Sequence, residues 1–112
     1  MAVYSDNELH DTINAYFTLL SADMSGRAIN KKQVYRDLQN KYDHVRSLGS
    51  YESKMQNIGA VMHSIGLPYV KGLKPRGNAG SKLRLLIKGI AIDRGLIEVA
   101  SWDLPNWTRD WL

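Results

Sequence analysis

Residues 46–78 read RSLGSYESKMQNIGAVMHSIGLPYVKGLKPRGN, and this stretch decides how the rest of the chain is organised. Ser50 is the predicted N-cap of a helix, because its hydroxyl can accept a hydrogen bond from a free amide of the first turn. Gly66 suits the left-handed residue that ends a helix, and Pro68 prevents the helix from continuing. Between these two signals, apolar residues recur at helical spacing and predict a core-facing helix: Met55, Ile58, Val61, Met62 and Ile65.

A basic loop is expected after this helix, over residues 67–80. It holds two prolines and three glycines, which imply fixed turns rather than a flexible linker. Lys71, Lys74 and Arg76 belong to this loop and have no acidic residue close to them in sequence. Glycines let backbone amides approach a phosphate, and basic side chains neutralise its charge. The loop is therefore a candidate surface for binding a polyanion.

Two helices are expected before this stretch. The first begins at Ser5, because Ser5 and Glu8 form a capping box in which each side chain satisfies the other's free amide. Gly26 is its expected stop. Its predicted buried face carries Leu9, Ile13, Tyr16, Phe17, Leu20 and Met24. The second helix is expected over residues 31–41, with Asn30 as its cap and an apolar stripe of Val34, Leu38 and Tyr42. Val45 and Leu48 are expected to anchor the segment that follows.

A fourth helix is expected from about Ser81 to Gly95, with an apolar face of Leu83, Leu86, Ile87 and Ile90. Residues 96–100 are predicted to form either a short strand or one more helical turn. Trp102 is expected to cover the helical core, whereas Trp107 and Trp111 suit contact with a partner protein. The predicted class is mostly α. We expect residues 1–112 to form one compact four-helix domain, with a rigid basic Pro/Gly loop between helices three and four.

The charges are distributed unevenly along the chain. Residues 1–26 carry four acidic and no basic residues, and residues 27–88 carry thirteen basic and three acidic ones. Residues 89–112 carry two basic and four acidic residues, so the net charge is +4. A basic middle flanked by acidic ends favours one polyanion-binding face. The competing interpretation is a solvated surface whose charges scatter around the fold.

Several functional classes are not expected. The chain has no cysteine, which excludes disulfides, a cysteine nucleophile and a thiolate zinc site. Glu52 and Lys54 spell the E-x-K pattern of some metal-dependent nucleases, but they fall in the first turn of a predicted helix. We therefore expect no enzyme, no metal and no cofactor. The sequence shows no signal-peptide pattern and no apolar run of about 18–20 residues, which favours a cytoplasmic protein without a membrane span.

Residues 46–78 also resemble a module found at the N-terminus of many bacterial HNH-endonuclease and restriction-type, modification-dependent proteins. Gly59 and Leu73 depart from the family's usual serine and aromatic residue. The resemblance implies a targeting role in DNA cleavage or in defence against foreign DNA. It implies no nuclease activity here, because the HNH domain is absent from these 112 residues. The matching positions are Arg46-Ser47, Gly49-Ser50, Glu52, Lys54, Asn57-Ile58, Ala60-Val61, Gly66-Leu67-Pro68-Tyr69, Gly72, Lys74-Pro75 and Asn78.

We therefore expect a domain that binds duplex DNA, modified or unmodified. The alternative is a protein-interaction or oligomerisation domain that docks a nuclease or a second copy of the chain. For Ser50, Asn57 and Tyr69, the favoured interpretation is structural: a cap, a brace for the loop and a core residue. The expected DNA contacts are Arg46, Ser50, Tyr51, Lys54, Asn57, Tyr69, Lys71, Lys74, Arg76, Asn78, Lys82, Arg84 and Lys88.

Overall fold

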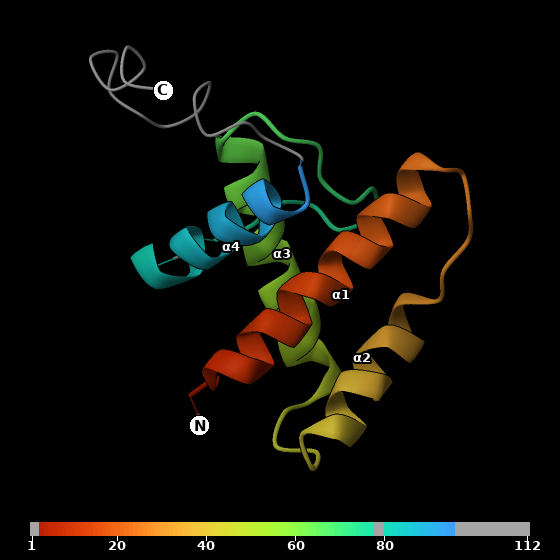
Figure 1. The fold of residues 1–112 in the computed structure, drawn as a ribbon. Coiled ribbons are helices and arrows are strands. Elements are labelled where there is room, and N and C mark those ends of the chain that lie inside the picture. Colours follow the sequence, from red (N-terminus) through yellow and green to blue (C-terminus); the bar gives the residue numbers. More distant parts are fainter. Residues whose placement is uncertain (1–2, 78–79, 96–112) are drawn as a thin grey trace.

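The computed structural model describes residues 3–77 and 80–95, which form four helices (Figure 1). These are α1 (Asp6–Met24), α2 (Lys31–Lys41), α3 (Leu48–Ser64) and α4 (Ser81–Asp93). α1 and α3 each pack against the other three helices. The predicted mostly-α, four-helix class is confirmed, since the described residues contain no strand. The predictions for Asn78 and residues 96–112 lie outside this part of the chain.

The start of α1 confirms only half of the predicted capping box. The hydroxyl of Ser5 accepts a hydrogen bond from the Glu8 amide at 3.1 Å. The Glu8 carboxylate does not turn back toward Ser5, because it is buried and bonded to distant residues. Met24 was expected on the buried face of α1. It lies at the last residue of the helix with 69% of its surface exposed, so that expectation is wrong.

α2 begins as predicted, whereas α3 begins earlier than predicted. The side chain of Asn30 accepts a hydrogen bond from the Gln33 amide at 3.2 Å and caps α2. For α3, the hydroxyl of Ser47 accepts from the Ser50 amide at 3.1 Å, so the N-cap is Ser47. The predicted cap at Ser50 is therefore wrong. Val45, an expected apolar anchor, is exposed, because the turn before α3 points it toward solvent.

The core combines the inner faces of the helices with two residues of the loop. Ile13 and Tyr16 of α1, together with Ile58 of α3, are completely buried. Val70 and Leu73 join this cluster from the segment between α3 and α4. Because the loop contributes apolar side chains to the core, it is held against the helices rather than projecting freely from them.

Hydrogen bonds join the loop to both α1 and α3. The hydroxyl of Tyr16 accepts a bond from the Val70 amide at 2.9 Å. Farther along, the Arg76 amide donates to the carbonyl of Gln56 in α3 at 3.1 Å. Gly66 has the left-handed conformation predicted for the residue that ends α3, with φ of 78°. The loop therefore runs along α3 between fixed attachments, as the prediction of fixed turns requires.

Gly59 lies where Tyr16 of α1 packs closely against α3. A β-carbon at this position would lie 3.0 Å from the hydroxyl oxygen of Tyr16 and 3.8 Å from the carbonyl oxygen of Leu73. Tyr16 is fully buried and its hydroxyl is bonded to Val70, so it has little room to move. A glycine inside a helix is thus explained by the space that Tyr16 occupies.

We expect Gly59→Ala to lower the free energy of unfolding by roughly 1 kcal/mol. The added methyl group overpacks the contact with Tyr16, which costs about 1–3 kcal/mol. The higher helix propensity of alanine offsets only about 1 kcal/mol of this cost. Gly89→Ala in α4 is the matched control, because nothing lies within 4 Å of a β-carbon there. It should raise the free energy of unfolding by roughly 0.5–1 kcal/mol. Urea unfolding measures both; stabilisation by Gly59→Ala would contradict the tight contact.

Candidate functional site

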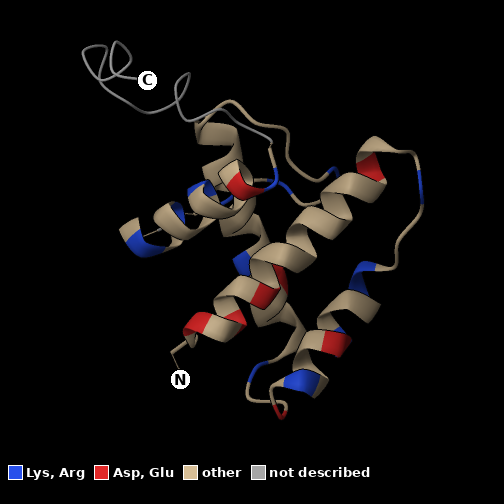
Figure 2. Cartoon of the chain, viewed as in Figure 1, with Lys and Arg blue, Asp and Glu red and all other residues tan. Residues whose placement is uncertain are grey.

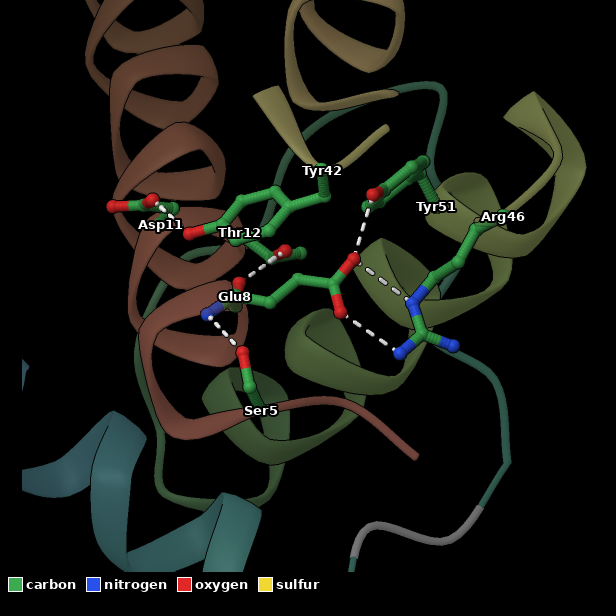
Figure 3. Close-up of polar contacts among 7 residues, drawn as sticks. All are labelled: Ser5, Glu8, Asp11, Thr12, Tyr42, Arg46 and Tyr51. Carbon is green, nitrogen blue, oxygen red and sulfur yellow. Dashed lines mark hydrogen bonds and ion pairs between the residues drawn. The ribbon is translucent and has the colours of Figure 1, made fainter. Parts of the chain in front are cut away.

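A buried polar cluster joins α1 to the start of α3 (Figure 3). The guanidinium of Arg46 donates to both carboxylate oxygens of Glu8, from Nε at 2.9 Å and from an Nη nitrogen at 2.8 Å. The hydroxyl of Tyr51 donates to the same carboxylate at 2.7 Å. All three residues are buried. Such a two-point contact between arginine and carboxylate is stronger and more directional than a single hydrogen bond.

The cluster holds its residues in defined protonation states. Burial raises the pKa of Glu8, but the hydrogen bonds from Arg46 and Tyr51 outweigh it, so the pKa lies below its ordinary value of 4.5. The hydrogen bond to Glu8 raises the pKa of Arg46. Burial and the bond to Glu8 raise the pKa of Tyr51 well above its ordinary range. At neutral pH the cluster is therefore an ion pair supported by a neutral tyrosine.

Two residues of this buried cluster were predicted to contact DNA. Arg46 was expected to meet a phosphate, but only 6% of its surface is exposed and its guanidinium binds Glu8. Tyr51 was expected to read bases, but it is completely buried. Glu8 was predicted only as a cap, yet it is the centre of the cluster. Its spacing of four from Thr12 and eight from Tyr16 places it on the buried face and could have indicated this role.

An open hollow of about 610 Å³ lies beside the cluster at the start of α3. Three of the predicted contact residues, Ser50, Lys54 and Asn57, lie on one side of α3 because they are spaced by four and then three residues. The hollow therefore brings these three together, and Arg46 forms part of its wall. Its full lining is Tyr4, Arg46, Ser47, Gly49, Ser50, Ser53, Lys54 and Asn57.

Lys54 gives this hollow one positive charge that no described carboxylate balances. The guanidinium carbon of Arg46 lies 3.4 Å from the centre of the Tyr4 ring, and the Lys54 ammonium lies 4.7 Å from it. Burial, and then the charge of Arg46, lower the pKa of Lys54. Within residues 3–77 and 80–95, no carboxylate pairs with Lys54, whereas Glu8 is already paired with Arg46. The hollow is therefore suited to attract an anion.

The second half of the loop adjoins the hollow. A β-carbon at Gly77 would lie 2.6 Å from the side-chain oxygen of Asn57, so the loop backbone passes directly against α3 there. Gly77 has φ of 83°, a left-handed conformation that also favours glycine. Asn57 thus both lines the hollow and contacts the loop, in agreement with its predicted role as a brace. The exposed side chain of Arg76 belongs to this same region.

The other predicted residues fall into two separate groups. Tyr69, Lys71 and Lys74 line a second hollow on the first half of the loop. Tyr69 is 39% exposed, so its alternative role as a core residue is wrong. The backbone amide of Lys71 donates to the carboxylate of Asp23 at 2.7 Å, which ties the loop to the end of α1.

The third group lies on α4. Lys82 pairs with Asp6 at 2.5 Å, while Arg84 and Lys88 are one turn apart and partly buried. Burial and the charge of Arg84 lower the pKa of Lys88. Figure 2 shows Lys and Arg on α2, on α4 and in the segments between helices, and acidic positions along α1. The predicted contact residues thus fall into three groups, and the hollow at α3 is lined by four of them, Arg46, Ser50, Lys54 and Asn57.

The chain matches no protein-family model, no curated protein and no solved structure. Among the residues that the structure describes, no three His, Asp or Glu side chains gather as a metal site would require. None of the four helices is long and apolar enough to cross a membrane.

We expect Glu8→Gln to lower the free energy of unfolding by roughly 3 kcal/mol, because loss of one partner leaves the Arg46 charge buried and uncompensated. The fold should still form at room temperature if its stability lies in the usual range of about 5–15 kcal/mol. Asp6→Asn is the control, since it breaks an exposed pair with Lys82 and should change the urea midpoint little. Equal effects of the two substitutions would contradict the importance of the buried pair.

The lowered pKa of Glu8 also predicts a pH dependence. Ionised Glu8 stabilises the fold above its unfolded pKa of about 4.5, and this contribution is lost as the pH falls through the lower folded pKa. We expect the stability of the native protein to fall more steeply below about pH 4.5 than that of Glu8→Gln. Thermal unfolding across this pH range measures the difference, and parallel curves would show that Glu8 does not titrate in this way.

Proposed function

We propose that this protein binds duplex DNA and serves as a targeting domain, using the hollow at the start of α3 and the adjoining loop. The main observation behind this proposal is that Lys54 shares one hollow with Ser50, Ser53 and Asn57. Among the described residues, no carboxylate pairs with Lys54. Hydroxyls, an amide and an ammonium are the groups that proteins use to hold backbone phosphates. The positive end of the α3 dipole lies at the same place and favours an anion further.

The loop extends this surface. The Arg76 amide is bonded to Gln56, the residue before Asn57 of the hollow, and the side chains of Lys71, Lys74 and Arg76 are exposed. Each basic side chain that neutralises a phosphate releases counterions, which strengthens binding at low salt. Since Tyr16 and Gln56 already hold the loop backbone, less conformational freedom would be lost on binding DNA.

The sequence resemblance supports a targeting role in particular. Arg46-Ser47, Gly49-Ser50, Lys54 and Asn57 belong to the positions that resemble the module of HNH-endonuclease and restriction-type proteins, and all of them line the hollow. We infer a setting in bacterial defence, in which this chain supplies DNA binding and another domain or protein supplies cleavage.

A second candidate function is the docking of a partner protein. The observation that favours it is Leu85, which is 68% exposed on α4 between Arg84 and Lys88. An exposed leucine on a helix can contribute to a protein interface. The two functions differ in salt dependence, because phosphate binding weakens steeply as salt rises whereas apolar contacts do not.

Gel shifts with a modified duplex, an unmodified duplex and single-stranded DNA test the proposal. We expect the duplexes to shift at low salt and binding to weaken as salt rises. Lys54→Gln should weaken binding to all duplex sequences alike and reduce the slope of log affinity against log salt by about 1, because one phosphate contact is lost. Lys74→Gln should behave similarly.

Arg36→Gln is the matched control, since Arg36 is an exposed cation on α2 that lines neither the hollow nor the second hollow of the loop. It should leave the salt slope unchanged. Absence of any shift at low salt would overturn DNA binding and favour protein docking. Equal losses in Lys54→Gln and Arg36→Gln would mean that binding is not localised at the hollow.

A further inference from the structure

A different hollow lies at the far end of α1. It has a volume of about 320 Å³ and is lined by Phe17, Leu20, Ser21, Met24, Ser25 and Arg94. Phe17 and Leu20 are almost fully buried, whereas Met24 at the rim is 69% exposed. An apolar recess with an exposed methionine beside it is suited to an aromatic or aliphatic side chain, because methionine adapts to such partners. The proposed DNA surface uses none of these residues.

Arg94 connects this hollow to the continuation of the chain. Its guanidinium carbon lies 5.1 Å from the centre of the Phe17 ring, and one of its nitrogens donates to the side-chain oxygen of Asn14 at 2.9 Å. Only Gly95 separates Arg94 from residues 96–112, which read LIEVASWDLPNWTRDWL. The described part of the chain therefore ends one residue after Arg94, which lines the hollow.

We propose that this hollow binds residues 96–112 of the same chain, and that Trp102 is the side chain that enters it. Trp102 follows Arg94 by eight residues, which span at most roughly 26–29 Å and so allow the indole to return to the hollow. Glu98 and Asp103 lie on either side of Trp102 in sequence, so their charges complement Arg94. Pockets of about 300–1,000 Å³ commonly hold small organic groups, and an indole is such a group.

Docking would cover apolar surface that the four helices leave open. Trp102 would pack mainly on Met24 and remove its exposed face from water, because Phe17 and Leu20 are already almost fully buried. The segment would then be anchored against α1 immediately after α4. Anything attached through residues 96–112 would be held at the α1–α4 side of the domain.

Tryptophan fluorescence tests the proposal on the full chain, because Trp102, Trp107 and Trp111 are its only tryptophans. Replacing Trp107 and Trp111 with Phe leaves Trp102 as the sole reporter. We expect its emission to lie at shorter wavelength than in urea and its quenching by acrylamide to be weak. Met24→Glu in this background should shift the emission toward the urea value and strengthen quenching, while the helical circular dichroism remains.

Leu85→Glu is the matched control. Leu85 is 68% exposed and Met24 is 69% exposed, but Leu85 does not line the hollow. It should leave Trp102 emission unchanged. The proposal is overturned if Trp102 already emits as in urea, or if Met24→Glu has no effect or the same effect as Leu85→Glu. It is also overturned if the short-wavelength emission disappears on dilution, because the occupant would then belong to a second copy.

Discussion

The buried ion pair between Glu8 and Arg46 is the interaction on which the rest of the structure depends. It joins the first turn of α1 to the residue before the α3 cap, 38 positions away in sequence. Transfer of each ion from water costs several kcal/mol, which only near-ideal geometry and further hydrogen bonds can offset. The two-point contact and the bond from Tyr51 provide that geometry. Because a displaced partner would leave a charge buried alone, the pair sets the position of α3 against α1.

The hollow at the start of α3 follows from this arrangement. Tyr51 turns inward to reach Glu8, and the helical repeat then places Ser50, Lys54 and Asn57 on a neighbouring side of α3. The loop is held against that side by the bond between the Arg76 amide and Gln56 and by the close passage of Gly77 past Asn57. Polar groups from separate segments are thus held in place before any ligand arrives.

Partners, rather than net charge, decide which basic residues are available to a ligand. Arg46 and Lys82 each have a carboxylate partner, whereas Lys54 has none among the described residues. The two hollows that carry our proposals also differ in the chemistry of their lining residues. The one at α3 combines cations with hydroxyls, and the one at the end of α1 is mainly apolar with a single arginine at its rim. Because the two hollows share no lining residue, DNA binding at one and docking of residues 96–112 at the other could occur at the same time.

The sequence alone determined the helical class, the four helices and the stops and caps at Ser5, Asn30 and Gly66, because periodicity and caps depend on residues only a few positions apart. It predicted the wrong cap for α3, Ser50 in place of Ser47, since both serines suit an N-cap and the start of α3 depends on Arg46, which is held by a residue of α1. Nor could it separate buried from exposed cations. Arginine and lysine look alike in sequence whether or not a distant carboxylate reaches them. Only the tertiary structure placed Arg46 in the interior and left Lys54 partly buried in an open hollow, because the partner of Arg46 lies 38 residues away.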